Sequence, residues 1–322
     1  MKKIKMFLIL TFGLWLVACN GEETSPSQDE QESSSAKRKI AVVLKGADQE
    51  YFKLAEAGAK QAFKDFDVKG TFLAASKETQ EQELLNILED LLIQAPDGLV
   101  VMPSTGSAIP TLKKYEDKNI PVLLIDTDLD WDGKVAYIGT DNYTAGQKVG
   151  EYLEEVLQPG AEVAIIEGVS GAAQNEARVA GAKDYLQEKG FKIATVQAAD
   201  FDRTKAVNTM ENIITAHPNI QAVFAANDEM ALGAYQALKT ANLDIPIIGI
   251  DGTTDALQSI ADGDVTASIE QLPYTMAYLA VENAIKSLNG EPVEKKIDSG
   301  IELITVENAA EKLENVKKLL GK

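Results

Sequence analysis

The chain has 322 residues, of which 45% are hydrophobic, and its formal net charge at pH 7 is −19. This length allows a large buried core and favours two domains over one. The acidic balance argues against nucleic acid as a partner, because binding phosphate groups requires a basic face. Cys19 is the only cysteine, which excludes an intramolecular disulfide and a cysteine-rich metal site or catalytic thiol elsewhere in the chain.

The apolar segment at residues 6–18 follows three lysines. At ~1.5 Å per residue, it is too short to cross a hydrocarbon core of ~30 Å, so we predict a secretion signal at residues 1–18. It ends in Leu16-Val-Ala-Cys19, which resembles the lipobox of bacterial lipoproteins, where cleavage precedes the cysteine and the cysteine is lipidated. We therefore expect Cys19 to carry a lipid; the alternative is an ordinary signal peptide with an incidental cysteine.

Residues 19–38 are polar and contain no large apolar residue that would seed a core. Glutamate, serine and glutamine dominate this stretch, as in disordered linkers. We expect residues 19–38 to form a tether between the lipidated cysteine and a folded body that begins at about residue 39.

Apolar strands alternate with helical patterns along the first part of the body. Strands are predicted at residues 40–44, 70–74, 98–102 and 122–125, and helices at 54–63, 80–94 and 108–118. Strands joined by helical crossovers form a parallel sheet. One α/β unit is complete at this point.

The alternation starts again after residue 141. Helices are predicted at residues 144–157, 175–189 and 205–217, strands at 162–167, 192–197, 222–226, 247–250 and 266–269, and a final amphipathic helix at 308–320. Two α/β units of about a hundred residues each match the usual domain size. A ligand crevice is expected between them, because the gap between domains is a preferred binding place.

Polar side chains follow many of the predicted strands. They are Lys45, Ser104, Asp126, Glu167, Asn227, Asp251 and the pair Glu270-Gln271. Ligands of parallel α/β sheets bind just beyond the carboxyl ends of the strands. The pattern therefore predicts a crevice that binds a polar small molecule.

Motifs for nucleotide binding and for hydrolysis are missing or incomplete. Gly168-Val-Ser-Gly171 lacks the dinucleotide glycine spacing and the Walker Lys-Ser/Thr pair. No Gly-x-Ser-x-Gly elbow is present, and the single histidine, His217, precedes a proline where a helix should end. Asp126 and Asp251 could be paired catalytic carboxylates, but no neighbouring residues form a metal cage or a second acid-base set. Binding is therefore favoured over catalysis, with an enzyme as the alternative.

Phe52 and Phe201 lie in polar loops, where an aromatic ring can face the apolar side of a sugar; burial in the core is the alternative for each. Arg178 lies in the first turns of a predicted helix, where a cation opposes the helix dipole and needs another partner. Its forked donors suit ligand hydroxyls, and a surface salt bridge is the alternative.

Several longer stretches match one family. They are Ala199-Asp-Phe-Asp-Arg203, Thr215-Ala-His-Pro218, residues 221–233, Asp251-Gly-Thr253 and Gln271-Leu-Pro273. From about residue 39 to residue 305 the chain resembles the ribose/galactose-type substrate-binding proteins of bacterial sugar ABC importers, most closely the ribose-binding branch. The related sugar-responsive repressors carry an N-terminal DNA-reading domain in the place that the lipobox and tether occupy here.

The resemblance implies an α/β fold of two doubly wound, parallel-sheet lobes, the type I fold of periplasmic binding proteins. Three hinge crossings are expected near residues 140–141, 271–273 and 299–301. The first lobe would then comprise residues 39–140 and 273–300. The second would comprise residues 141–272 and 301–322.

The resemblance also assigns roles in a sugar site. Asp126 and Asp251 correspond to carboxylates that accept sugar hydroxyls, and Arg178, Asn227 and Gln271 to donors. Phe52 and Phe201 correspond to stacking rings, and Thr140 stands where the family has a small hydroxyl residue.

The first lobe departs from the ribose-binding pattern. Gln49-Glu50-Tyr51-Phe52 replaces Asn-Pro-Phe-Phe, Met102 replaces an asparagine, Thr127 replaces an arginine, and Lys45 replaces a small polar residue. The ligand therefore need not be ribose. The full set of expected ligand-binding residues is Lys45, Gln49, Tyr51, Phe52, Met102, Asp126, Thr127, Thr140, Arg178, Phe201, Asn227, Asp251 and Gln271.

Lys45 has two possible roles. It neutralises Asp126 or Asp128, or it contacts the ligand directly; we favour direct contact, because Met102 and Thr127 remove two polar groups from the same lobe. Lys45 with two aromatic residues six and seven positions later is also similar to autoinducer-2 receptors of the same superfamily, which are the alternative for the ligand.

The sequence thus predicts an extracytoplasmic, lipid-anchored solute-binding protein rather than an enzyme. It would capture a pentose-like sugar or a polyol and deliver it to an ABC permease and its ATPase subunit. We expect a monomer that needs no cofactor or metal and touches the membrane only through its lipid.

Overall fold

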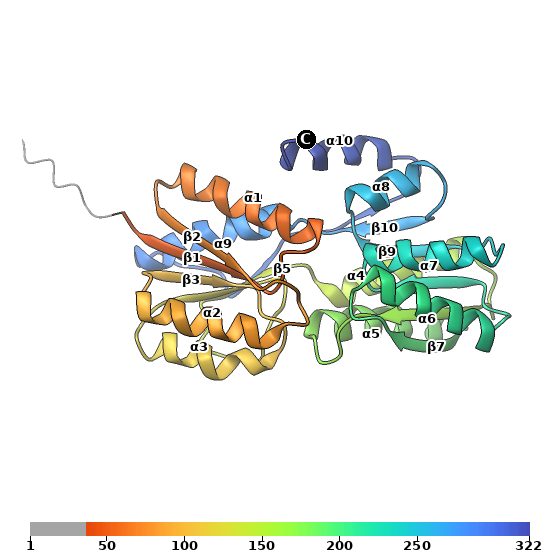
Figure 1. The fold of residues 1–322 in the computed structure, drawn as a ribbon, viewed down its shortest axis with the longest axis horizontal. Coiled ribbons are helices and arrows are strands. Elements are labelled where there is room, and N and C mark those ends of the chain that lie inside the picture. Colours follow the sequence, from red (N-terminus) through yellow and green to blue (C-terminus); the bar gives the residue numbers. More distant parts are fainter. Residues whose placement is uncertain (1–36) are drawn as a thin grey trace, which may run out of the picture. The chain divides into compact units, whose positions relative to one another are not determined.

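The structure is a computed structural model, and it describes residues 37–322. The predicted signal peptide, Cys19 and most of the predicted tether lie outside the described residues. Helices and strands alternate along the described part (Figure 1). No helix between residues 37 and 322 is long and apolar enough to cross a membrane.

The first sheet has six strands in the order β11-β5-β4-β3-β1-β2, and every neighbouring pair is parallel. Its strands are β1 (Lys39–Leu44), β2 (Lys69–Ala74), β3 (Gly98–Val101), β4 (Val122–Ile125), β5 (Ala136–Gly139) and β11 (Lys296–Asp298). The helices that belong with it are α1 (Glu50–Asp65), α2 (Glu81–Gln94), η1 (Gly106–Ala108), α3 (Ile109–Glu116) and α9 (Pro273–Leu288). We call this group of elements the first lobe.

The second sheet has six strands in the order β12-β10-β9-β8-β6-β7, parallel except for the antiparallel pair β10–β12. Its strands are β6 (Glu162–Glu167), β7 (Lys192–Ala198), β8 (Ala222–Ala225), β9 (Ile247–Asp251), β10 (Ala267–Glu270) and β12 (Glu302–Ile304). The helices of this second lobe are α4 (Asn142–Val156), α5 (Ala173–Glu188), α6 (Arg203–Ala216), α7 (Asp228–Thr240), α8 (Thr254–Ala261) and α10 (Ala309–Leu319). The prediction of two mostly parallel α/β sheets is confirmed.

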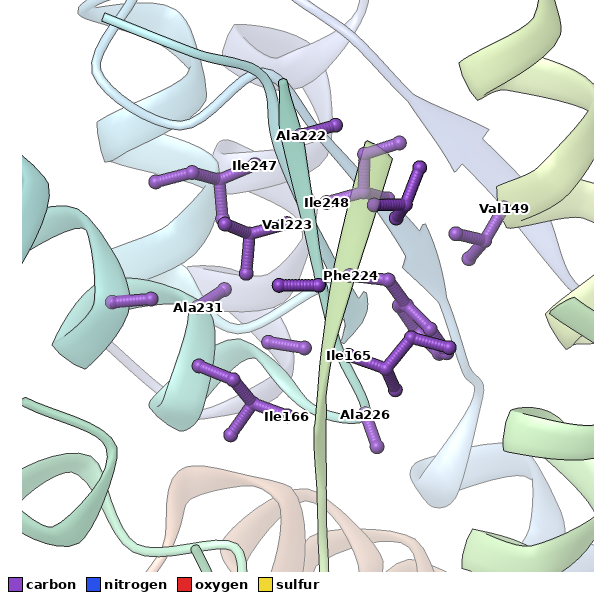
Figure 2. Packing of buried hydrophobic residues seen from close by; sticks show 14 of the residues in the cluster. Val149, Ile165, Ile166, Ala222, Val223, Phe224, Ala226, Ala231, Ile247 and Ile248 are labelled. Carbon is purple, nitrogen blue, oxygen red and sulfur yellow. The ribbon is translucent and has the colours of Figure 1, made fainter. Parts of the chain in front are cut away.

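Both sheets are buried on both faces, which explains their continuous apolar strands. In β1, Val42 packs with α1 and α9, while its neighbour Val43 packs with α2 and α3. Figure 2 shows the same alternation in the second sheet: Phe224 lies on the side of Val149 of α4, and Val223 on the side of Ala231 of α7. Successive strand residues point to opposite faces, so each strand serves two helical layers.

Several helices begin at an acid or amide that caps the first turn. Asp141 accepts a hydrogen bond from the backbone N–H of Thr144 at the start of α4, at 3.1 Å. Asp202 does the same for Lys205 at the start of α6, at 2.9 Å. Each cap supplies a partner for a backbone donor that the helix itself leaves unpaired. Polar residues therefore recur where a loop enters a helix.

The chain passes between the two sheets three times, after β5, after β10 and after β11. Each crossing carries one buried side-chain oxygen that has no hydrogen-bond partner among residues 37–322: Thr140 Oγ1, Gln271 Oε1 and Ser299 Oγ. Buried polar atoms are normally paired. The crossings are thus places where a ligand or a change of hinge angle can supply a missing partner.

Candidate ligand-binding site

A pocket with a free volume of about 30 Å³ lies between the strand ends of the two sheets. Its lining residues are Lys45, Gln49, Tyr51, Phe52, Glu78, Asp126, Gln174, Arg178, Phe201, Asn227, Asp251 and Gln271. The lining combines three aromatic rings with charged groups of both signs. This volume is far below the ~300–1,000 Å³ that is usual for small-molecule sites, so a ligand has to displace some of the side chains that fill the pocket.

The ends of the parallel strands bring these residues together. Lys45 follows β1, Asp126 follows β4, Asn227 follows β8, Asp251 ends β9 and Gln271 follows β10. All five line the pocket. Because the carboxyl ends of parallel strands meet at one edge of a sheet, residues far apart in sequence share one site.

Three pocket residues have the left-handed backbone that side chains rarely adopt: Asp126 at φ 63°, Phe201 at φ 57° and Asp251 at φ 139°. Such conformations cost about 1–3 kcal/mol each and persist only where surrounding contacts hold them. After Asp251, the backbone N–H groups of Gly252 and Thr253 both donate to Asp228 Oδ2 at 2.8 Å. The buried carboxylate of Asp228 therefore holds the turn that aims Asp251 at the pocket.

Lys45 is 3% exposed, and three oxygens surround its ammonium. Its Nζ lies 2.7 Å from Asp126 Oδ2, 3.0 Å from Glu78 Oε1 and 3.1 Å from Thr127 Oγ1. An ammonium has three donors, and all three are used here. This geometry favours the neutralising role of Lys45 over the direct ligand contact that we favoured from sequence, and the carboxylate partners are Asp126 and Glu78. Asp128 instead pairs with Lys134 at 2.8 Å.

The pKa values of this group reflect burial and mutual charge. Burial alone would lower the pKa of Lys45, but the charges of Asp126 and Glu78 outweigh it and raise that pKa. Burial would raise the pKa of Asp126, and the Lys45 charge together with hydrogen bonds from Lys45 and Tyr51 brings it below its ordinary value. Burial raises the pKa of Glu78 in spite of Lys45. Of the two carboxyl groups, Asp126 is therefore the one whose charged form is favoured.

Tyr51 joins the same wall. Its hydroxyl donates to Asp126 Oδ1 at 2.6 Å, while Lys45 donates to Oδ2. Burial and then the charge of Asp126 raise the pKa of Tyr51 well above its ordinary value, so the phenol keeps its proton. Both oxygens of Asp126 thus have protein partners.

Arg178 is 2% exposed, and its guanidinium is held by neutral acceptors. Nε and Nη2 donate to Asn142 Oδ1 at 3.1 and 2.6 Å, and Nη1 donates to the backbone oxygen of Ala226 at 2.6 Å. A surface salt bridge is therefore excluded for Arg178. Asn142 and the end of β8 hold this cation near the start of α5 and position it in the pocket wall.

Asn227, Asp251 and Gln271 form the remaining polar wall. Asn227 Oδ1 caps α7 through the N–H of Met230 at 3.0 Å, and Gln271 Nε2 donates to Asp251 Oδ1 at 2.7 Å. Gln271 Oε1 is buried without a partner in the described chain. Burial, then the charge of nearby Asp228, raises the pKa of Asp251 well above its ordinary value. This second group of residues still has a hydrogen-bond acceptor that is free among the described residues, whereas both carboxylate oxygens of Asp126 in the first lobe already accept hydrogen bonds from the protein.

Both phenylalanine side chains, Phe52 and Phe201, line the pocket, and a glycine makes room for each ring. A Cβ at Gly46 would lie 2.4 Å from the Phe52 ring, and a Cβ at Gly168 would lie 2.1 Å from the Phe201 ring. The start of the Gly168-Val-Ser-Gly171 segment therefore serves to pack an aromatic residue of the pocket.

The remaining predicted ligand residues, Met102, Thr127 and Thr140, do not line the pocket. Met102 packs in the apolar core under α1 and α9. Thr127 lies behind Lys45 and supports it, and Thr140 lines a separate cavity at the first crossing. The structure does not bring these three residues to the pocket, and their ligand contacts stay predictions: Met102 lies in the core, Thr127 is bonded by Lys45, and Thr140 lies at the first crossing.

Glu78 and Gln174 line the pocket and were missed from the sequence. Glu78 lies in the polar loop after β2. The signal that could have identified it is the same as for the other site residues: a polar side chain shortly after the end of a strand. Gln174 precedes Arg178 by one helical turn on α5, and residues at this spacing share a helix face.

A second contact between the lobes lies outside the pocket. Thr254, at the start of α8, donates its N–H and its hydroxyl to Glu50 of α1 at 2.6 and 2.7 Å. Lys322 pairs with the same carboxylate at 3.1 Å. Leu54, one turn later on α1, is buried in an apolar cluster with residues of α8 and α10. We call Glu50, Leu54 and Thr254 the clasp.

Each lobe contains one sheet, and the strand ends of the two sheets enclose a polar pocket. This arrangement defines a bilobal binding protein. No group of three or more potential metal ligands occurs in residues 37–322. The chain belongs to the periplasmic binding protein family: residues 40–292 match the family model described as periplasmic binding protein domain. The resemblance noted in the sequence is thereby confirmed.

Relatives of known function agree with this placement. The chain is 36% identical to the ribose import binding protein RbsB of Bacillus subtilis over 92% of this chain and 97% of that protein. A carbohydrate transporter solute-binding protein of Agrobacterium radiobacter, solved with D-arabinose, is 29% identical, has a TM-score of 0.82 and covers 89% of this chain and 100% of its own. A solute-binding protein of Actinobacillus succinogenes, solved with D-allose, is 30% identical, with a TM-score of 0.79 over 85% of this chain and 100% of its own.

Proposed function

We propose that this protein captures one neutral monosaccharide or small polyol between its lobes and delivers it to an ABC permease and its ATPase subunit. The observation that carries the proposal is Gln271 Oε1, a buried acceptor without a partner in the described chain, in a crossing segment that lines the pocket. A ligand hydroxyl supplies the missing donor. Asp251, Asn227 and Arg178 lie in the same lining and offer further acceptors and donors.

The charges of the pocket support a neutral ligand. Lys45 pairs with Asp126 and Glu78, and burial raises the pKa of Glu78 and of Asp251, which disfavours their charged forms. Cations and anions are thus nearly balanced before a ligand enters. A charged ligand, such as a sugar acid or sugar phosphate, would leave an uncompensated buried charge, which is costly.

The aromatic rings of Phe52 and Phe201 support a sugar or cyclic polyol. Both are buried, and both line the pocket. An aromatic face packs against the apolar C–H face of a sugar ring, while the polar walls bind its hydroxyls. The relatives named above for ribose, or solved with arabinose or allose, favour an aldose of five or six carbons.

Transport rather than catalysis is the proposed use of the site. The relatives are named as binding or solute-binding proteins, which supports delivery to a membrane permease. The lipobox-like Leu16-Val-Ala-Cys19 supports tethering through a lipid on Cys19 at the extracytoplasmic side of the membrane. The polar stretch after it would act as a flexible linker.

Calorimetry against a panel of pentoses, hexoses, polyols and autoinducer-2, with mass spectrometry of ligand recovered from the purified protein, tests the proposal. We expect saturable binding of at least one neutral sugar or polyol, and recovery of that ligand unchanged. Chemical conversion of the ligand, or binding restricted to charged molecules, would refute the proposal.

A further inference from the structure

Two lining residues, Glu78 and Gln174, have no part in the sugar contacts proposed above. Glu78 belongs to the loop after β2 in the first lobe, and Gln174 to the first turn of α5 in the second lobe. Gln174 Nε2 donates to Glu78 Oε1 at 3.0 Å, and both side chains are buried. We call this hydrogen bond the Glu78–Gln174 bridge.

The bridge is fixed by other protein groups on both sides. Gln174 Oε1 accepts a hydrogen bond from the Thr127 hydroxyl at 3.0 Å, and Glu78 Oε1 also pairs with Lys45 at 3.0 Å. A ligand that displaced Gln174 would leave a buried carboxylate with one partner fewer, and leaving buried groups unpaired costs free energy. The bridge is therefore braced by protein groups at both of its ends.

A second polar contact joins the lobes at another part of the lining. Gln49 Nε2 donates to the backbone oxygen of Phe201 at 3.1 Å. Two groups in hydrogen-bond contact leave no space for a ligand atom between them. A ligand that leaves the Glu78–Gln174 bridge and the Gln49–Phe201 contact intact is confined between them.

We propose that the Glu78–Gln174 bridge determines specificity by limiting the size of the sugar. It closes one end of the pocket, so that a pentose or a compact polyol fits and a sugar with an additional hydroxymethyl group is rejected. This inference rests on the proposed function of sugar binding. It assigns a specificity role to two residues that hold each other rather than the ligand.

The test compares the affinities of matched pentoses and hexoses, such as ribose and allose or arabinose and galactose, for the wild-type protein and for Gln174→Ala. The substitution removes the bridge and opens space, while Glu78 keeps Lys45. We expect the ratio of pentose to hexose affinity to fall by about tenfold or more, within the ~10–200-fold that one methylene is worth in a fitted pocket.

Two further variants separate size from other effects. Gln187→Ala changes an exposed glutamine on the same helix, so its affinity ratio should equal that of the wild type. Glu78→Gln removes the charge but keeps the shape and an acceptor oxygen for Gln174, so its ratio should also stay within about twofold of the wild type. Thermal unfolding with and without ligand shows whether each variant is folded.

The outcomes are distinct. A lowered ratio in Gln174→Ala alone supports the inference. An equal loss for every sugar would make the bridge a closure contact and overturn the size role, as would an unchanged ratio in a folded Gln174→Ala protein. If the wild-type protein binds no neutral sugar, the proposed function fails, and the inference fails with it.

Discussion

Replacing Lys45 by methionine removes the only cation that pairs with Asp126 and Glu78 in the described structure. Both carboxylates are buried, with Tyr51 still donating to Asp126 and Gln174 to Glu78. Methionine has a similar length and fills the same space without a charge. The change therefore isolates the electrostatic role of the lysine.

The expected loss of stability is large. Breaking a buried ion pair by removing one partner costs about 3–5 kcal/mol, because an uncompensated charge remains. In the wild-type protein, burial already raises the pKa of Glu78 against the charge of Lys45, and loss of that charge raises it further. Glu78 can then take up a proton in the folded state. The destabilisation of Lys45→Met should therefore be greatest above neutral pH and smaller at pH 5.

Urea unfolding of wild type and Lys45→Met at pH 5 and pH 8 measures this difference. The control is Lys60→Met in the same lobe. Lys60 pairs with Glu56, and the lysine side chain is 57% exposed. Surface pairs of this kind contribute about 0–1 kcal/mol to stability. A second substitution, Glu78→Gln in the Lys45→Met background, should restore part of the stability, because it removes one of the two unpaired carboxylates.

Ligand affinity completes the test. If Lys45 only neutralises the carboxylates, Lys45→Met should weaken every sugar and polyol by a similar factor. A loss confined to one ligand, together with unchanged stability and no rescue by Glu78→Gln, would refute the reasoning and restore the direct contact that sequence favoured.

Three other perturbations follow from the structure. Glu50→Ala removes the cap that the clasp places on α8 at Thr254. A lost cap is worth about 1–2 kcal/mol, so ligand affinity should fall roughly 5–30-fold. X-ray scattering should show a more open ligand-free protein, and an unchanged scattering curve would mean that the clasp is irrelevant to closure. Burial raises the pKa of Asp228 from 3.8 to about 6, so the folded wild type binds this proton more tightly than the unfolded chain and loses up to ~3 kcal/mol of stability as pH rises from about 4 past 6. Urea unfolding should show that Asp228→Asn gains stability relative to wild type over that range, and a pH-independent difference in stability would contradict the assignment. Cys19→Ala should release the protein from membranes or leave the precursor uncleaved, and unchanged lipid labelling would argue against the anchor.

The local pattern of apolar and polar residues was sufficient to predict the α/β fold class. Most of the helices and strands between residue 40 and residue 269 were predicted, because strands covered on both faces are continuously apolar and their neighbouring helices are amphipathic; β5 and α8 were not predicted. Short strands at the sheet ends were not. β11 and β12 have three residues each and are partly exposed, so they lack the apolar run that marks a buried strand. Their places come from pairing with β5 and β10.

The candidate site divides in the same way. Asp126, Asn227 and Asp251 were recognised because each stands at a strand end, and strand order alone brings such residues to one edge. The amphipathic and strand-end patterns, read along the chain, therefore determined the fold class and most of the pocket lining.

What only the tertiary structure decided is how the side chains share their hydrogen bonds. Lys45 meets Glu78, which lies 33 positions later in the chain, and Gln174 of the other lobe reaches the same carboxylate. No local pattern encodes that meeting, because it depends on how two separately folded sheets face each other across the pocket. The role of a buried charge is set by the partners that surround it, and those partners come from distant parts of the sequence.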